Sequence, residues 1–279
     1  LPRLLIFLFF SLTPFLSFAT TYYSRANTAW NIASTWSTSA CGGAAAVTTS
    51  TATDDVIICE TYTVNIGTTG TCRSLTINGT ANYTAGVATS VGTGGVIINS
   101  GGNITGTAAG VITTTGGLVL NSVLTSTSVS IRTITTPGQT ISGTGSLGRL
   151  DVSINTINNG NITVTTALLS TVASSLTQGV SSSLTYNGNT LAPSLDASAA
   201  GNTVTYGGAA QTVKTATYHN LIINGSGIKT LGGAITVNGN LTVNAGTLST
   251  STFQITGNAT GIFTLAASTQ LNVGLNSSA

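Results

Sequence analysis

Residues 74–80 read SLTINGT, residues 96–102 read VIINSGG and residues 118–122 read LVLNS. In each segment, apolar residues alternate with Thr or with another apolar residue, and Asn or Gly follows. Alternation with a period of two is typical of a β-strand with one buried side. Asn and Gly tolerate the left-handed backbone that a tight corner requires. The three segments therefore predict short strands that each end at a turn.

The same unit recurs along most of the chain. Its corner residues Asn78, Asn99 and Asn121 are 21 and 22 positions apart, Asn187 and Gly207 are 20 apart, and Asn224 and Asn244 are 20 apart. A repeat of this length signals a solenoid, in which stacked coils share one continuous core. We expect inward side chains at Leu75, Ile77, Val96, Ile98, Ile235, Val237, Leu241 and Val243. The predicted fold is all-β, a right-handed parallel β-helix of roughly a dozen coils.

Asn-Gly dipeptides allow a second fold. They begin at Asn78, Asn159, Asn187, Asn224 and Asn238, and such pairs often form the two-residue hairpins of an antiparallel β-sandwich. The β-helix is favoured because the apolar runs are short and similar throughout, whereas sandwich strands usually run longer.

The ends of the chain give the domain organisation. Residues 1–19 carry Arg3, an apolar stretch and Ser17-Phe18-Ala19, which predicts a secretory signal peptide and an extracellular or cell-surface protein. Ser11, Thr13 and Pro14 interrupt the apolar run, so no membrane span is expected after signal removal. Residues 20–90 are expected to cap the β-helix and form its first coils. Residues 91–279 are expected to be its repeats, truncated at the carboxy end.

Composition excludes several functions. Thr, Ser, Asn and Gly make up about half of the 279 residues, only 12 residues are charged, and the net charge is +2. A nucleic-acid binder needs a stripe of Lys and Arg, and a calcium-repeat protein needs dense carboxylates. GTGSLG (143–148) has the glycines of a dinucleotide site, but strand-like RLDVSI follows it, so no cofactor is predicted.

The three cysteines Cys41, Cys59 and Cys72 allow one disulfide after export. Cys59 and Cys72 are the preferred pair because both lie in strand-like stretches. Their offset of 13 also matches Glu60 with Arg73, so an ion pair is expected beside the disulfide. Without a Cys-x-x-Cys motif, no zinc site is predicted.

Polysaccharide-cleaving β-helices need clustered acidic and basic groups. Asp54 and Asp55 are adjacent in a strand and point to opposite sides, which favours a role in strand entry. Asp151 follows Arg149 by two residues, as expected for a solvated ion pair. Asp196 and the lone His219 have no evident partner. No catalytic or metal-binding residue is predicted, and a carbohydrate-active enzyme remains the first alternative function.

Two other residue types could contact a ligand. Trp30 and Trp36 could stack on a sugar ring, but we interpret them as aromatics that cap the first coil. Thr-x-Thr pairs begin at residues 61, 113, 125, 133, 163, 203 and 215, and a flat array of such pairs would bind ice, the second alternative function. The starts of these pairs are not spaced by one coil, so they do not predict an aligned face.

Longer segments resemble a known group of proteins. YYSRANTAWNIASTWS (22–37), DDVIICETYTVNI (54–66) and CRSLTINGT (72–80) resemble the amino-terminal β-helical module of secreted and surface proteins of Bacteroidetes, and distantly the eight-glycine extracellular domain family. Residues 203–248 are similar to a repeat of the same proteins, through Gln211 to Val213, Tyr218 to Leu221 and Lys229 to Gly233. The resemblance implies a fold and a compartment, with little about activity.

These observations favour a structural or adhesive role. A nearly uncharged solenoid with a Thr/Ser/Asn surface presents many hydroxyl and amide groups, which suit repeated weak contacts with polysaccharide or neighbouring cells. The expected partners are therefore extracellular polysaccharides or other surface proteins, and no nucleic acid.

Overall fold

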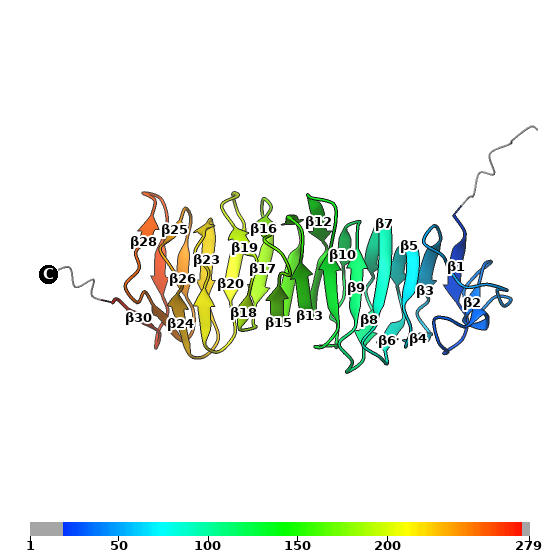
Figure 1. The fold of residues 1–279 in the computed structure, drawn as a ribbon. Coiled ribbons are helices and arrows are strands. Elements are labelled where there is room, and N and C mark those ends of the chain that lie inside the picture. Colours follow the sequence, from blue (N-terminus) through cyan, green and yellow to red (C-terminus); the bar gives the residue numbers. More distant parts are fainter. Residues whose placement is uncertain (1–18, 275–279) are drawn as a thin grey trace, which may run out of the picture.

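The structure, a computed structural model, describes residues 19–274, so the predicted signal peptide lies almost wholly outside the described residues. Its strands stack into an elongated β-solenoid of about 11 turns (Figure 1). Among the described strand pairs, only β1 (Thr21–Ser24) with β2 (Trp36–Ser37) is antiparallel. The predicted parallel β-helix is confirmed, and the sandwich is wrong.

Strands of successive turns form three columns of parallel neighbours. The ladder of the second column is broken between residues 105 and 144, where a single bridge joins Val123 to Ser146. The first column contains β1, β3 (Asp55–Ile58), the second halves of β5 (Gly70–Ile77) and β7 (Ala88–Ile98), β10 (Leu118–Leu120), β12 (Gln139–Ser142), β14 (Thr156–Asn158), β16 (Ser175–Gln178), β19 (Ser194–Asp196), β22 (Thr217–Tyr218), β25 (Ile235–Val237) and β28 (Ile255–Gly257). The second contains β4 (Thr63–Ile66), β6 (Thr80–Tyr83), β8 (Asn103–Thr105), the first halves of β13 (Thr144–Val152) and β15 (Asn161–Leu169), β17 (Ser183–Tyr186), β20 (Thr203–Tyr206), β23 (Asn220–Ile223), β26 (Leu241–Val243) and β29 (Phe263–Leu265). The third contains the first halves of β5 and β7, β9 (Val111–Thr114), β11 (Ser130–Thr133), the second halves of β13 and β15, β18 (Thr190–Leu191), β21 (Gln211–Val213), β24 (Ile228–Leu231), β27 (Thr247–Ser249) and β30 (Gln270–Asn272). One 3-10 turn, η1 (Ala33–Thr35), is the sole helical element of the described residues.

Turn length varies along the solenoid. Ladder partners are 17 residues apart from Gln139 to Thr156 and 23 apart from Leu118 to Ile141. The first turn is longer, 34 residues from Thr21 to Asp55. The corners absorb these differences, so the strands keep their register while the loops between them change length.

The core is the interior that the three columns enclose. All eight inward positions predicted from the repeats are buried, from Leu75 and Ile77 at 0% exposed to Leu241 at 7%. The alternating strands place one side chain inward and the next outward, and each inward side chain stacks on its equivalent one turn away. This stacking buries a continuous apolar interior that no single turn could form.

The Asn residues lie at the predicted corners, but they do not adopt the expected left-handed backbone, since no described Asn has a positive φ. The backbone N–H groups of Asn99 and Asn121 donate to Ile77 O and Ile98 O, the end of the preceding turn's strand, at 3.0 and 2.8 Å. Asn99 Nδ2 donates to Asn78 Oδ1 at 2.8 Å. Asn224 and Asn244 form an equivalent corner ladder after the second column. The backbone ladder therefore continues into the corners, and between Asn78 and Asn99 a side-chain bond extends it.

Trp30 and Trp36 lie at the amino-terminal end, 3% and 0% exposed. Trp36 Nε1 donates to Trp30 O at 2.8 Å, and the two rings meet edge to face with centroids 5.1 Å apart. A Cβ on Gly70 would lie 2.7 Å from the Trp30 ring. The bare glycine thus lets the indole pack directly on the first strand of the third column.

The predicted disulfide is wrong, because Cys59 bonds to Cys41 and Cys72 is a buried free thiol. An offset of 13 is shorter than one turn. Asp55 pairs with Ser74, so the residue beside Cys59 one turn later is Asn78. Cys72 lies in the third column with its side chain in the core, whereas Cys59 follows a first-column strand.

The predicted Glu60–Arg73 ion pair is wrong for the same reason. Arg73 instead pairs with Asp55, and Ser74 Oγ donates to the same carboxylate at 2.5 Å. Glu60 is exposed and forms no ion pair within residues 19–274. Asp54 is buried beneath the strand entry, so the prediction that Asp54 and Asp55 point to opposite sides is confirmed.

The cysteine pairing can be tested by proteolysis without reduction. Cleavage after Asp55, Glu60 and Arg73 puts the three cysteines on separate peptides. Mass spectrometry should find the Cys41 and Cys59 peptides joined. A maleimide should label Cys72 only in denaturant, because burial, with a smaller contribution from the Asp55 charge, raises the pKa of its thiol to about 12. A Cys59–Cys72 peptide would contradict the structure.

Asp54 should stabilise the first turn in a pH-dependent way. It accepts hydrogen bonds from Thr51 N at 2.8 Å, Thr51 Oγ1 at 2.6 Å and Thr20 N at 3.1 Å. Burial opposes ionisation, but these bonds outweigh it and hold the pKa of Asp54 below its usual value. The stabilisation is therefore present above the unfolded-state pKa and is lost as the pH falls through the folded-state pKa.

We expect Asp54→Asn to lower the free energy of unfolding by about 1–3 kcal/mol at pH 7. The difference from the unchanged protein should shrink at pH 3, where Asp54 approaches its protonated form. Urea titration at both pH values measures this, with Asp196→Asn on the exposed surface as the control. An equal loss at pH 7 and pH 3 would rule out ionisation as the source.

Candidate binding face

A row of hydroxyl groups runs along the outer side of the second column. Its members are outward side chains that occupy one register position in successive turns: Ser146, Thr163, Thr185, Thr205, Ile222, Thr242 and Thr264. We call this row the threonine face. Because parallel strands lie about 4.7–4.9 Å apart, the row repeats at that interval. Ile222 is its only apolar member.

A second row runs beside it, two residues earlier in each strand. Its members are Thr144, Asn161, Ser183, Thr203 and Asn220. Successive residues on one side of a strand are about 6.5–7 Å apart, so the two rows form a regular two-dimensional array. Neither row contains a charged residue.

The hydroxyls of the threonine face differ from their equivalents in the first turns. There, Asn82 Nδ2 donates to Asn65 Oδ1 at 2.9 Å, and Thr105 Oγ1 donates to Asn82 Oδ1 at 3.0 Å. In residues 19–274, the side chains of Thr163, Thr185 and Thr205 have no hydrogen-bond partner, although they are only partly exposed. The early turns thus satisfy their polar groups internally, whereas the threonine face leaves its hydroxyls for solvent or a ligand.

This alignment differs from the sequence expectation. The Thr-x-Thr pair at 163–165 begins on this face and the pair at 203–205 ends on it, but Thr185 and Thr242 belong to no such pair. Thr133 instead points into the core and Thr113 lies on the third column. Spacing between pairs therefore could not reveal the row. The signal that could is an outward Thr at the third position of the successive strands β15, β17 and β20.

The acidic side chains have structural partners. Asp151 is 1% exposed and accepts from Arg132 Nε at 2.7 Å and from Ser153 Oγ at 2.7 Å. The expected Arg149–Asp151 pair is wrong, because Arg149 Nε faces Ser130 Oγ of the previous turn at 3.3 Å. An outward side chain lies as close to the outward residue of the neighbouring turn as to the next outward residue of its own strand. Here the neighbouring turn supplies the cation, Arg132.

Asp196 and His219 do not form a catalytic pair with Asp151. Asp196 is exposed on the first column and accepts from Ser198 N and Oγ at 3.1 and 2.7 Å. His219 lies at the following corner, where its backbone N–H donates to Ala197 O. Asp151 lies on the third column. No group of His, Cys, Asp and Glu suited to a metal occurs in the described part of the chain.

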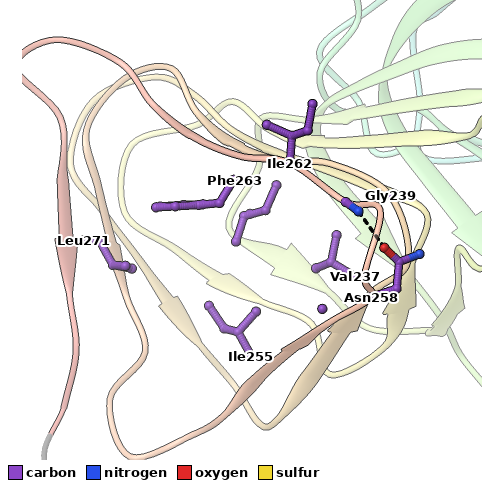
Figure 2. Close-up of a pocket in the computed structure, with 10 residues that line it drawn as sticks. Val237, Gly239, Ile255, Asn258, Ile262, Phe263 and Leu271 are labelled. Carbon is purple, nitrogen blue, oxygen red and sulfur yellow. Dashed lines mark hydrogen bonds between the residues drawn. The ribbon is translucent and has the colours of Figure 1, made fainter.

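An apolar cavity of about 270 Å³ opens at the carboxy-terminal end (Figure 2). Val237, Ile255, Phe263 and Leu271 line it. Phe263 is 48% exposed, whereas Leu241, its equivalent one turn earlier, is 7% exposed because the next turn covers it. Within residues 19–274 no further turn covers Phe263, so the cavity is the end of the described core, and Asn258 is the one polar side chain in its lining.

A scan of protein-family models and searches of curated proteins and of solved structures found no match to this chain. The resemblance to Bacteroidetes surface proteins therefore stays a prediction. Between residues 19 and 274 no helix has the length and hydrophobicity that a membrane crossing requires.

Proposed function

We propose that this protein is an extracellular or cell-surface solenoid that adheres to polysaccharide through the threonine face. The observation that carries the proposal is the register of Thr163, Thr185 and Thr205, whose hydroxyls have no partner in the described chain. A hydroxyl array at a fixed interval can form many hydrogen bonds with an extended polymer that presents its own hydroxyls regularly. Individually weak contacts then add up to useful avidity.

The chemistry of the two rows favours an uncharged ligand. They contain hydroxyl and amide groups, which donate and accept equally well, and they lack Lys, Arg, Asp and Glu. Binding through such groups should depend little on ionic strength, because no ion pair is available for salt to screen. The expected ligands are therefore neutral polysaccharides.

The disulfide supports export. A Cys41–Cys59 bond persists in an oxidising compartment and is rare in the cytosol. The proposed location outside the cell also fits a surface of Thr, Ser and Asn with few charged residues.

Ice is the second candidate ligand, and the same alignment favours it. Each Thr presents a hydroxyl and a methyl group, and in a parallel ladder both repeat with the regularity of the backbone. A regular array of this kind can order water over its whole area. Ile222 interrupts the hydroxyls but keeps a methyl group at that position.

Replacement of the hydroxyls tests the face without changing the shape of its side chains. Thr163→Val, Thr185→Val and Thr205→Val together remove three hydroxyls and keep β-branched residues in the strands. At about 0.5–1.5 kcal/mol for each hydrogen bond, we expect retention on insoluble cellulose or chitin to fall at least tenfold. Co-sedimentation measures the bound fraction.

The matched control carries Thr177→Val, Thr217→Val and Thr236→Val, which remove three outward hydroxyls from the first column. It should bind as the unchanged protein does. An equal loss in the control, or no binding by the unchanged protein, would refute polysaccharide adhesion through this face. Growth of shaped ice crystals without binding to either polymer would favour the second candidate.

A further inference from the structure

The third column is interrupted between two successive turns. β18 pairs with β15 on one side, whereas β21 begins a separate sheet with β24, β27 and β30. No backbone hydrogen bond joins β18 to β21 in the described residues. On the first column, a single bridge from Ala197 to Tyr218 joins the same two turns. The wall of the solenoid is therefore open at this point of the third column.

A cavity of about 440 Å³ lies in this opening. Its lining includes Tyr186, Thr190, Leu191, Thr212, Lys214 and Thr215. The three threonines are exposed and form its rim. The volume falls within the range of small-molecule sites, and the lining combines an aromatic ring, hydroxyls and one cation, with no acidic residue.

Tyr186 supplies a buried hydroxyl without a partner. Its side chain is 1% exposed and packs edge to face against Tyr206, with ring centroids 6.2 Å apart. The neighbouring phenols are satisfied, since the hydroxyls of Tyr206 and Tyr218 are 3.1 Å apart and Lys214 N donates to Tyr206 at 2.8 Å. Of these three phenols, only the Tyr186 hydroxyl has no hydrogen bond among the described residues, a costly arrangement that a ligand would relieve.

Lys214 brings a positive charge to the opening. Its Nζ donates to Leu191 O at 3.4 Å and Ala192 O at 3.2 Å, two carbonyl groups at the interrupted ladder. An ammonium group has three protons to donate, so one remains for a ligand. No acidic side chain pairs with Lys214 within residues 19–274.

We propose that this cavity binds a sugar residue that carries a carboxylate, with Lys214 facing the carboxylate and the Tyr186 hydroxyl bonded to a ring hydroxyl. The aromatic edge and the rim threonines suit the body of a pyranose, and the unpaired ammonium selects an acidic sugar over a neutral one. The cavity opens on the third column, and Tyr186 reaches it from the inner side of the second-column strand β17. None of its lining residues belongs to the threonine face, so the site does not depend on that face.

Calorimetric titration with trigalacturonate and with the neutral galactose trisaccharide tests the site in the folded chain. We expect measurable binding of the acidic trisaccharide and at least tenfold weaker binding of the neutral one. Lys214→Met should remove this preference, and Lys214→Arg should keep it. Tyr186→Phe should weaken both ligands about fivefold without lowering the melting temperature, since the hydroxyl it removes has no partner.

Three controls separate binding from folding and from the first proposal. Tyr83→Phe removes a phenol that is bonded to Thr89 at 2.7 Å, so it should lower the melting temperature and leave affinity unchanged. Arg149→Met removes a positive charge elsewhere on the third column and should not affect binding. The triple valine variant of the threonine face should bind trigalacturonate normally. Failure of the unchanged protein to bind trigalacturonate, or unchanged affinity in Tyr186→Phe and Lys214→Met, would overturn the proposal.

Discussion

The parallel backbone ladder between turns is the constraint on which this structure depends. A short strand can satisfy its N–H and C=O groups only with the strands one turn before and one turn after it. Equivalent residues are therefore stacked on each other along a column. Tyr186 meets Tyr206 inside the core, Asn78 meets Asn99 at a corner, and Thr185 meets Thr205 on the outer side. Core, corners and candidate binding face all follow from this one periodicity.

The sequence could predict the features that depend on the period alone. Alternation and corner Asn or Gly residues recur along the chain, so the inward residues and the parallel fold were accessible from the pattern. The particular partners were not, because turn length ranges from 17 to 23 residues after a first turn of 34, and each turn visits three columns. Cys59 and Cys72 are close in the chain, but they lie on different columns. The threonine face was missed because its members come from strands with unequal spacing.

Some polar side chains inside the solenoid bond to backbone carbonyl groups. Gln211 and Lys229 occupy equivalent inward positions in successive turns, and both donate to backbone carbonyl groups. Gln211 Nε2 donates to Tyr186 O and Gly188 O at 2.9 and 2.6 Å, and Lys229 Nζ donates to Gly208 O and Ser226 O at 2.6 Å. Three of these carbonyls, on Gly188, Gly208 and Ser226, lie at corners outside the strands, whereas Tyr186 O also accepts from Gly207 N at 2.9 Å. The repeat motif around Gln211 and Lys229 thus serves the backbone.

The interruption between β18 and β21 also has a mechanical meaning. The stability of a solenoid is close to a sum of the stabilities of its turns and of the interfaces between neighbours. At this one interface, the second column keeps the regular ladder from β17 to β20, and the first column contributes a single bridge. On the third column, side-chain hydrogen bonds take the place of the backbone ladder. Heat or tension should therefore divide the solenoid there, and the two blocks on either side should unfold as separate cooperative units.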